Sequence, residues 1–233
     1  SSPGRINITS INLTIYPSGK IDASGAGYPG GSGSSNGQGP GGGSGTYVSY
    51  AYAGGGGGGY GGNGGNSRNN ALGGSPYGSP TQPTDLGSGG GGEYDSDKGY
   101  STSGGAGGGA IFINATNLIV NGSILANGEN GGDNSCSYTN GACGGGGSGG
   151  SIWIITNNLE GNGSITANGG NGAGNNAGGG SGGRISIYYS SLNFNGNISV
   201  KGGSGYQYGA PGTIALNGDA FPGFCDWKLS NST

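Results

Sequence analysis

The residues of this chain that could carry chemistry are asparagines in glycosylation motifs, three cysteines and ten acidic side chains. Asn-x-Ser/Thr, the acceptor motif of N-linked glycans in secreted proteins, begins at Asn7, Asn12, Asn114, Asn121, Asn162, Asn197 and Asn231. Asn121 and Asn162 each precede the same Gly-Ser-Ile sequence, so they occupy equivalent turns from which a glycan could point to solvent. We therefore expect N-linked glycans on at least three of these asparagines.

The cysteines indicate the compartment. Cys136 and Cys143 lie in a stretch rich in glycine, serine and asparagine, where a disulfide could close a short loop. A disulfide would indicate an oxidising compartment outside the cytosol, and the alternative is two free thiols. Cys225 is left over, and we expect it to be either free or bonded to another chain.

Catalytic and metal-binding patterns are weak. The chain has no histidine, which excludes histidine-based nucleophilic triads and histidine metal sites. The acidic residues concentrate only in Glu93-Tyr-Asp95-Ser-Asp97-Lys-Gly99. Its Asp-x-Asp-x-Gly core resembles part of a calcium loop, but the other ligands of that pattern are missing, which favours a solvated turn. We expect no catalytic, cofactor or metal site and no enzymatic activity.

The composition is unlike that of an ordinary globular domain. Glycine accounts for 67 of the 233 residues, and charged residues for only 7%, against about 25% in typical domains. The basic residues are scattered, whereas a nucleic-acid surface would cluster them, and no apolar run approaches the roughly 18 residues of a membrane-spanning helix. We expect no nucleic-acid partner and no membrane insertion. A chain with no methionine and no signal peptide is expected to be a mature, processed product.

An internal repeat organises the sequence. Its shared pattern starts with an aliphatic residue, which is followed by Gly four residues later, Ile six later, Ala or Val eight later and Gly ten later. The four copies begin at Ile15, Leu118, Leu159 and Leu192. A second element, of the form Ile-x-Ile or Ile-x-Leu, begins at Ile6, Ile111, Ile152, Ile185 and Ile214. Alternating, β-branched patterns indicate half-buried strands, and the Asn-Gly and Ser-Gly steps between them indicate turns.

Stacking of such units would bury isoleucines that a single unit leaves exposed. We therefore predict a single all-β domain over residues 1–233, built as a parallel β-helix or solenoid. Its first inward, in-register ladder would contain Ile111, Ile113, Ile152, Ile154, Ile185, Ile187 and Ile214. A second ladder would contain Ile124, Ile165 and Ile198. The alternative is an antiparallel β-sandwich.

Glycine-rich tracts separate the strand units, and the longest is a Gly/Tyr-rich insertion at residues 26–109. Such tracts could be flexible linkers. Because glycine lacks a Cβ, they could instead form polyglycine-II-like segments, with the geometry of polyproline II, that pack backbone against backbone. Residues 219–233 form a C-terminal tail outside the repeat.

Several of these stretches resemble a known repeat. The resemblance rests on four stretches: residues 179–188, Gly-Gly-Ser-Gly-Gly-Arg-Ile-Ser-Ile-Tyr, then Phe194-Asn-Gly-Asn-Ile198, Lys201-Gly-Gly-Ser-Gly205 and Pro211-Gly-Thr-Ile214. They resemble a glycine-rich repeat of large surface and secreted proteins in bacteria and protists, over about residues 104–218 and partly over 4–27. The resemblance implies an extracellular β-solenoid with no assigned reaction. The side-by-side glycine helices are also similar to some phage adhesin tips and antifreeze proteins.

Two functions fit these patterns. The first is an extracellular or cell-surface structural glycoprotein, the subunit of a filament, sheath or coat. It would self-associate into a homopolymer by end-to-end stacking, since open strand edges without caps can be satisfied by a second copy. The alternative is a glycan-binding adhesin module that uses exposed tyrosines.

Overall fold

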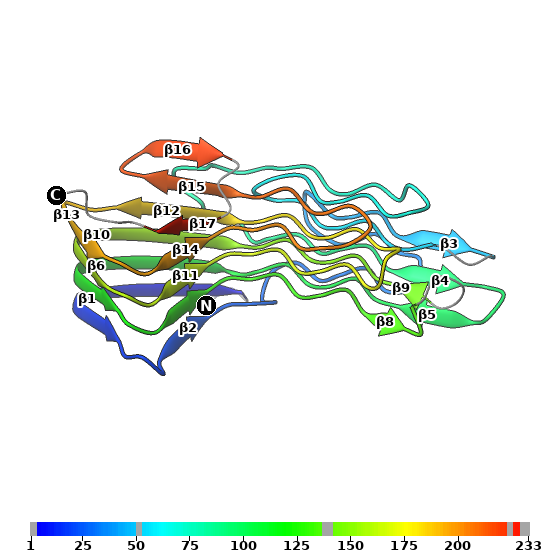
Figure 1. Ribbon diagram of the computed structural model, residues 1–233, viewed down its shortest axis with the longest axis horizontal. Helices are drawn as coiled ribbons and strands as arrows, with labels where there is room; N and C mark the ends of the chain where they lie inside the picture. The colour runs from blue at the N-terminus through cyan, green and yellow to red at the C-terminus, as the bar shows by residue number, and fades with distance from the viewer. Residues whose placement is uncertain (1–3, 50–52, 137–141, 223–225, 229–233) are drawn as a thin grey trace.

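The computed structural model describes residues 4–49, 53–136, 142–222 and 226–228. Within these ranges the protein is all-β, with strands and extended segments and no helix, and none of it could span a bilayer as a helix. Figure 1 shows an elongated molecule with two stacked sheets at one end, a bundle of extended segments in the middle and short strands at the far end. The all-β prediction is confirmed.

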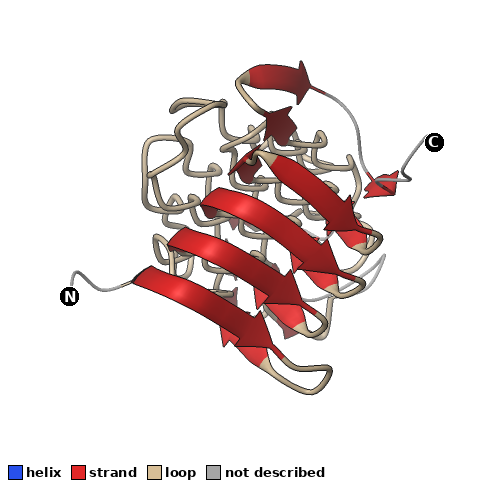
Figure 2. Ribbon diagram, turned by 90° about the vertical axis from the view of Figure 1, so that its left-hand side faces the viewer, coloured by secondary structure: helices blue, strands red, loops and turns tan. Residues whose placement is uncertain are grey.

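The largest sheet has seven strands. They are β1 (Arg5–Ile15), β6 (Ala110–Val120), β10 (Ser151–Gly161), β12 (Arg184–Tyr188), β13 (Ser191–Phe194), β15 (Thr213–Leu216) and β16 (Asp219–Pro222). A second sheet contains β2 (Lys20–Asp22), β7 (Ser123–Leu125), β11 (Ser164–Thr166), β14 (Asn197–Ser199) and β17 (Asp226–Lys228). Figure 2 shows the long strands of the first sheet stacked in chain order from β1 upward.

Two small sheets lie at the far end of the molecule. One consists of β3 (Thr46–Val48), β4 (Glu93–Asp95) and β5 (Tyr100–Thr102), and the other of β8 (Asp133–Asn134) and β9 (Ala142–Cys143). Both are built from the glycine-rich tracts between the repeat units. We call this part of the molecule the distal end.

The predicted isoleucine ladders are present, and their strands pair in parallel. Ile111, Ile152, Ile185 and Ile214 are partners along the first sheet, and the two-residue alternation places Ile113, Ile154 and Ile187 beside them. In the second sheet Ile124, Ile165 and Ile198 are partners. All of these side chains are buried in one core. The strands that carry these ladders do not pair antiparallel with one another, as the sandwich alternative would require.

Alignment of the first repeat by sequence was wrong by two residues. The pattern places Ile15 opposite Leu118, but Leu13 pairs with Leu118 and Ile15 with Val120. The extra residues lie instead in the turn before β2, where the Gly19 N–H bonds to the Tyr16 carbonyl. A spacing pattern counts residues but does not say where an insertion is accommodated.

The two main sheets are mixed, because their last strands run antiparallel. β16 pairs with β15, and β17 pairs with β14. Part of the predicted C-terminal tail therefore forms strands that cover the edges of the last parallel strands, which corrects the expectation of an uncapped stack at this end. At the opposite end, β1 and β2 are outermost and have no further strand beside them among the described residues.

The middle of the molecule is held by backbone hydrogen bonds between glycine-rich segments. The successive N–H groups of residues 145–150 donate to the carbonyls of Gly91, Gly178, Glu129, Ser88, Ser181 and Ala126, over 2.7 to 3.0 Å. The first three acceptors lie on three different segments, and the next three return to these segments in the same order. A period of three residues is that of a polyproline-II helix, whereas a β-strand has a period of two.

Close packing explains the glycine content of these segments. A Cβ added to Gly180 would lie 2.0 Å from the Gly147 carbonyl oxygen, and one added to Gly147 would lie 2.0 Å from that of Ala106. Neighbouring backbones therefore occupy the space that a side chain would need. The ordered-packing interpretation of the tracts holds for the described residues, and the flexible-linker interpretation does not.

Candidate functional site

The predicted glycosylation asparagines lie on the strand region, at different depths. Asn7, Asn12, Asn114 and Asn162 are exposed, and Asn121 and Asn197 are half-buried. Asn231 lies outside the described residues. Asn7 and Asn12 both belong to the outermost strand β1, so two acceptor motifs mark the open end of the stack.

Asparagine side chains also join one repeat unit to the next. The Asn158 side-chain N–H donates to Asn117 Oδ1, and the Asn117 side chain donates to Asn12 Oδ1, each over 2.7 Å. Asn127 and Asn168 use their Oδ1 atoms differently, accepting a backbone N–H from the following unit. The sequence analysis missed these roles, although Asn127 and Asn168 recur at one repeat position and could have been found there.

The predicted disulfide is present at the distal end. Cys136 and Cys143 are bonded, with their Cα atoms 5.2 Å apart, and Cys225 lies outside the described residues. The Cys143 N–H donates to Glu93 Oε2 over 2.7 Å. Glu93 is 1% exposed, and this burial raises its pKa to about 7, the nearby Asp95 charge adds to the rise, and the Cys143 hydrogen bond opposes it.

The acidic cluster that contains Glu93 forms a turn. Asp95 Oδ1 accepts the backbone N–H of Asp97 over 3.0 Å and that of Lys98 over 3.4 Å, the geometry of an Asx turn. In the part of the chain that the structure describes, no three Cys, Asp or Glu residues come together in a way that could hold a metal ion. The predicted turn is present, but it is not solvated as expected, because Glu93 and Asp95 are buried.

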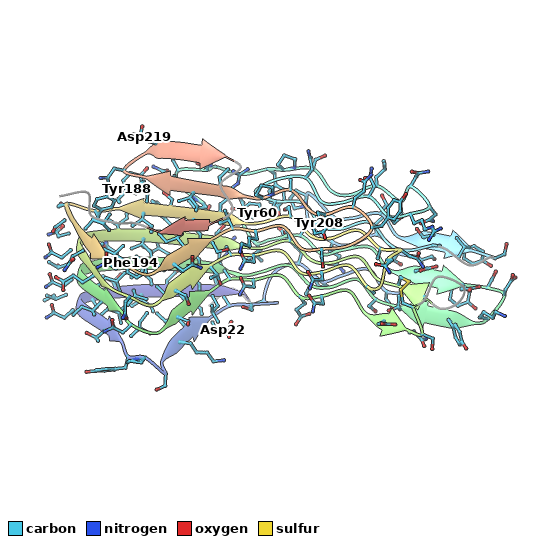
Figure 3. All side chains as sticks on the ribbon, in the orientation of Figure 1. Asp22, Tyr60, Tyr188, Phe194, Tyr208 and Asp219 are labelled. Atoms are coloured by element: carbon cyan, nitrogen blue, oxygen red, sulfur yellow. A yellow bond between two sulfur atoms is a disulfide. The ribbon has the colours of Figure 1, made fainter. Side chains whose placement is uncertain are left out.

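A buried polar cluster attaches the insertion to the first sheet. Tyr60 is fully buried, and its hydroxyl lies 2.6 Å from Ser151 Oγ. The Arg184 side chain donates from Nε to the Tyr77 carbonyl over 3.0 Å and from Nη1 to Thr213 Oγ1 over 3.0 Å. Figure 3 shows Tyr60 where the strands meet the glycine segments. Sequence reasoning did not find this cluster, because its members are far apart in the chain.

Desolvation dominates the electrostatics of this cluster. It raises the pKa of Tyr60 to about 12 and lowers that of Arg184. Tyr60 therefore stays a neutral hydroxyl at physiological pH, and Arg184 is stabilised by carbonyl and hydroxyl oxygens. The cluster fixes structure, and nothing in its geometry activates a nucleophile.

An aromatic groove lies on the outer face of the first sheet. Phe112 and Trp153 are neighbours across β6 and β10, with ring centres 4.9 Å apart and planes tilted by 55°. Together with Arg5, Asn7, Pro83 and Thr84 they line a cavity of about 240 Å³. The Trp153 Nε1 atom is buried and has no acceptor among the described residues.

The open end of the stack has a second hollow, of about 440 Å³. It lies between β1 and β2 and is lined by Ile8, Leu13, Ile15, Tyr16 and Ile21, among others. Ile8, Leu13 and Ile21 continue the buried ladders but remain only half-buried, because no further unit covers them among the described residues. The apolar interior of the molecule is thus accessible at this end.

The tyrosines, whose exposed members the adhesin alternative would use, are divided among several places. Tyr47 and Tyr94 are stacked at the distal end, with ring centres 5.6 Å apart, and Tyr47 is 66% exposed. Tyr208 is exposed on a separate loop, whereas Tyr60 is in the interior. Tyr50 and Tyr52 lie outside the described residues. No single tyrosine surface is formed by the described residues.

Comparison of the chain with models of known protein families, with curated proteins and with solved structures found no match in any of the three.

Proposed function

We propose that this protein is an extracellular structural glycoprotein, a non-enzymatic subunit of a surface filament, sheath or coat that assembles through the open end of its strand stack. In this proposal the strand region is a parallel β-solenoid, and the glycine-rich segments are a polyglycine-II-like bundle that makes each subunit rigid. The disulfide supports an oxidising location outside the cytosol.

The observation that carries the proposal is the difference between the two ends of the stack. Among the described residues, no strand pairs with the outer edges of β1 and β2, which lie beside an apolar hollow, whereas β16 and β17 cover the opposite end. Free edges of this kind recruit further strands, and a partner would bury the half-buried ladder residues Ile8, Leu13 and Ile21. Assembly through the β1 and β2 end is therefore favoured over unlimited end-to-end stacking, which needs two open ends.

Glycans would complement this low-charge surface. The formal net charge is only −3, so electrostatic repulsion opposes association weakly. Exposed acceptor asparagines such as Asn114 and Asn162 lie along the stack, where glycans would keep assemblies soluble and prevent lateral contact between sheets.

The test is to purify the native material and examine its size, its glycopeptides and its location. Light scattering and electron microscopy should show assemblies larger than a 22.1 kDa chain with its glycans. Glycopeptide mass spectrometry should find at least three occupied asparagines. A monodisperse single subunit at all concentrations, or unmodified asparagines throughout, would contradict the proposal.

A second candidate function, a glycan-binding module, is favoured by the aromatic groove. The Phe112 and Trp153 rings could stack on a sugar ring, and the Arg5 and Asn7 side chains line the same cavity with polar groups. Binding of the native protein to a glycan array, lost in a Trp153→Ala variant that still self-associates, would favour this alternative.

A further inference from the structure

The outer edge of β1 has backbone groups whose directions can be derived from its bonds to β6. In a parallel ladder a residue directs both its N–H and its C=O to one neighbour, and the next residue directs both away. The Gly4 carbonyl accepts the Ala110 N–H, and the Ile15 carbonyl accepts the Asn121 N–H. Counting from these two ends, the groups of Asn7, Thr9, Asn12 and Thr14 point to the open edge.

The alternation of backbone directions switches from odd-numbered to even-numbered residues at Ile11, the position that has no partner in the register of β1 with β6. Because of this switch, the order of core-facing and outward-facing residues is the same whether it is followed from the start or from the end of β1. Ile6 and Ile8 point to the core on one side, and Leu13 and Ile15 on the other. The residues that face the open edge are polar on both sides.

This pattern is self-complementary in one antiparallel register. If Asn7 lies opposite Thr14 of a second copy, Thr9 lies opposite Asn12 of that copy, and all four have free backbone groups to exchange. The same register places Ile6 opposite Ile15 and Ile8 opposite Leu13, so core side chains meet core side chains. A shift by one residue would place core residues opposite polar ones.

The edge of β2 is self-complementary as well. The Gly19 carbonyl accepts the Ser123 N–H, and the Ala23 N–H donates to the Leu125 carbonyl, so Lys20 and Asp22 direct their backbone groups to the open edge. Antiparallel pairing of β2 about Ile21 places Lys20 opposite Asp22 of a second copy. These opposite charges now form an exposed pair within one chain, 3.4 Å apart.

We propose that two copies of this chain join head to head about a two-fold axis, with β1 against β1 and β2 against β2. The proposal rests on the self-association proposed above and specifies its geometry: a closed, isologous pair, which would be the building unit of a sheath or coat and excludes a filament that grows through this end. One axis through the middle of β1 and through Ile21 generates both pairings, because the two strands belong to the same layer of the stack. The apolar hollow at the open end is then shared by two copies and closed to water.

The row of hydrogen-bonded side chains Asn158, Asn117 and Asn12 would continue into the second copy. Asn12 uses Oδ1 to accept from Asn117, which leaves its side-chain N–H groups to donate to Thr9 of the second copy. The glycosylation motifs at Asn7 and Asn12 must stay unmodified in this pair, because a glycan on either would separate the copies by its bulk, and the glycans of the proposed function would lie on the other motifs. The experiment therefore uses full-length unglycosylated protein exported to an oxidising compartment, so that the disulfide forms.

Sedimentation equilibrium over a wide concentration range should show a species of twice 22.1 kDa and nothing larger. A monomer at every concentration would overturn both this proposal and the self-association on which it rests. Polymers that grow with concentration would overturn the closed pair alone and leave self-association in place.

A charge exchange tests the β2 seam. K20D and D22K each place like charges opposite each other in both symmetric contacts, and each should weaken the pair about tenfold. An equimolar mixture of the two single variants should pair again, because each contact then joins opposite charges. The contact within each chain stays repulsive in this mixture, so recovery reports the contact between chains. Failure of the mixture to recover would overturn the seam.

Cysteine pairs test the register of β1. In the T9C/N12C variant each new thiol lies opposite its partner position, at about the 5.5 Å between Cα atoms that a disulfide can span. Mild oxidation should give a covalent dimer whose cross-links, mapped by peptide mass spectrometry, join positions 9 and 12. The T9C/T14C variant carries the same number of new thiols out of register and should give no cross-link between positions 9 and 14. Equal cross-linking of the two variants would overturn the register.

Discussion

The guanidinium of Arg184 lies over the ring of Tyr60, 5.3 Å from its centre, and its Nη2 atom donates to the Tyr60 carbonyl over 3.3 Å. Arg184 begins a strand of the first sheet, and Tyr60 belongs to the glycine-rich insertion, 124 residues earlier in the chain. A buried guanidinium that donates to carbonyl oxygens holds their segments in place, because moving a segment away would break a charge-assisted hydrogen bond. This contact therefore attaches the insertion to the strand stack.

Removing the Tyr60 hydroxyl should weaken this attachment. Tyr60→Phe loses the 2.6 Å hydrogen bond to Ser151 and should lower the free energy of unfolding by about 1 kcal/mol, as measured by chemical denaturation. Tyr208→Phe is the matched control. Tyr208 is 74% exposed, so removing its hydroxyl should leave the free energy of unfolding unchanged. Equal effects of the two substitutions would contradict the role of Tyr60.

The isoleucine ladder should be sensitive to cavities. Ile187→Ala removes a fully buried side chain and should lower the free energy of unfolding by about 2 to 5 kcal/mol. Ile11→Ala changes the same residue type at a position that is 72% exposed, and its effect on the unassociated chain should be small. A neutral result for Ile187 would mean that the inward face has been assigned incorrectly.

The glycine bundle should not accept even one methyl group at its centre. Gly180→Ala would place a Cβ 2.0 Å from a backbone carbonyl oxygen that cannot move independently, and should destabilise the protein by at least about 2 kcal/mol. Gly19→Ala, whose closest contact would be 3.2 Å, should be tolerated much better. Thermal unfolding of both variants would show this difference, and similar melting temperatures would contradict backbone packing as the cause.

The buried Glu93 should make stability depend on pH in an unusual direction. Its folded pKa of about 7 is above the ordinary value of 4.5, so the unfolded state loses this proton first as pH rises. The associated stability is complete below pH 4.5 and is lost as pH rises through 7, with a total on the order of 3 kcal/mol.

Glu93→Gln retains an oxygen that can accept the Cys143 N–H and cannot ionise, so this loss between pH 4.5 and 7 should disappear. Denaturation curves across that range would measure the change. Glu129→Gln, at an exposed position, should leave the pH dependence in place. An identical pH profile for wild type and Glu93→Gln would show that the Glu93 carboxyl is not the group responsible.

The sequence by itself determined the strands and what they bury. Ile-x-Ile patterns repeated with turn residues between them predict strands in register, because alternation and β-branching are local properties that each unit carries independently. The Cys136 and Cys143 pairing was also predictable, since two nearby cysteines in a short loop can bond in few ways. Both expectations required only residues that are close together in the chain.

Only the tertiary structure decided how the glycine-rich segments pack and how the stack ends. A glycine has no side chain from which its packing neighbour could be predicted. The hydrogen-bond partners of residues 145–150 are therefore set by the three-dimensional bundle and not by any local pattern. Tyr60 and Arg184 meet for the same reason, across a long separation. The antiparallel return of β16 and β17 depends on which edges are already occupied, and it leaves β1 and β2 as the open end.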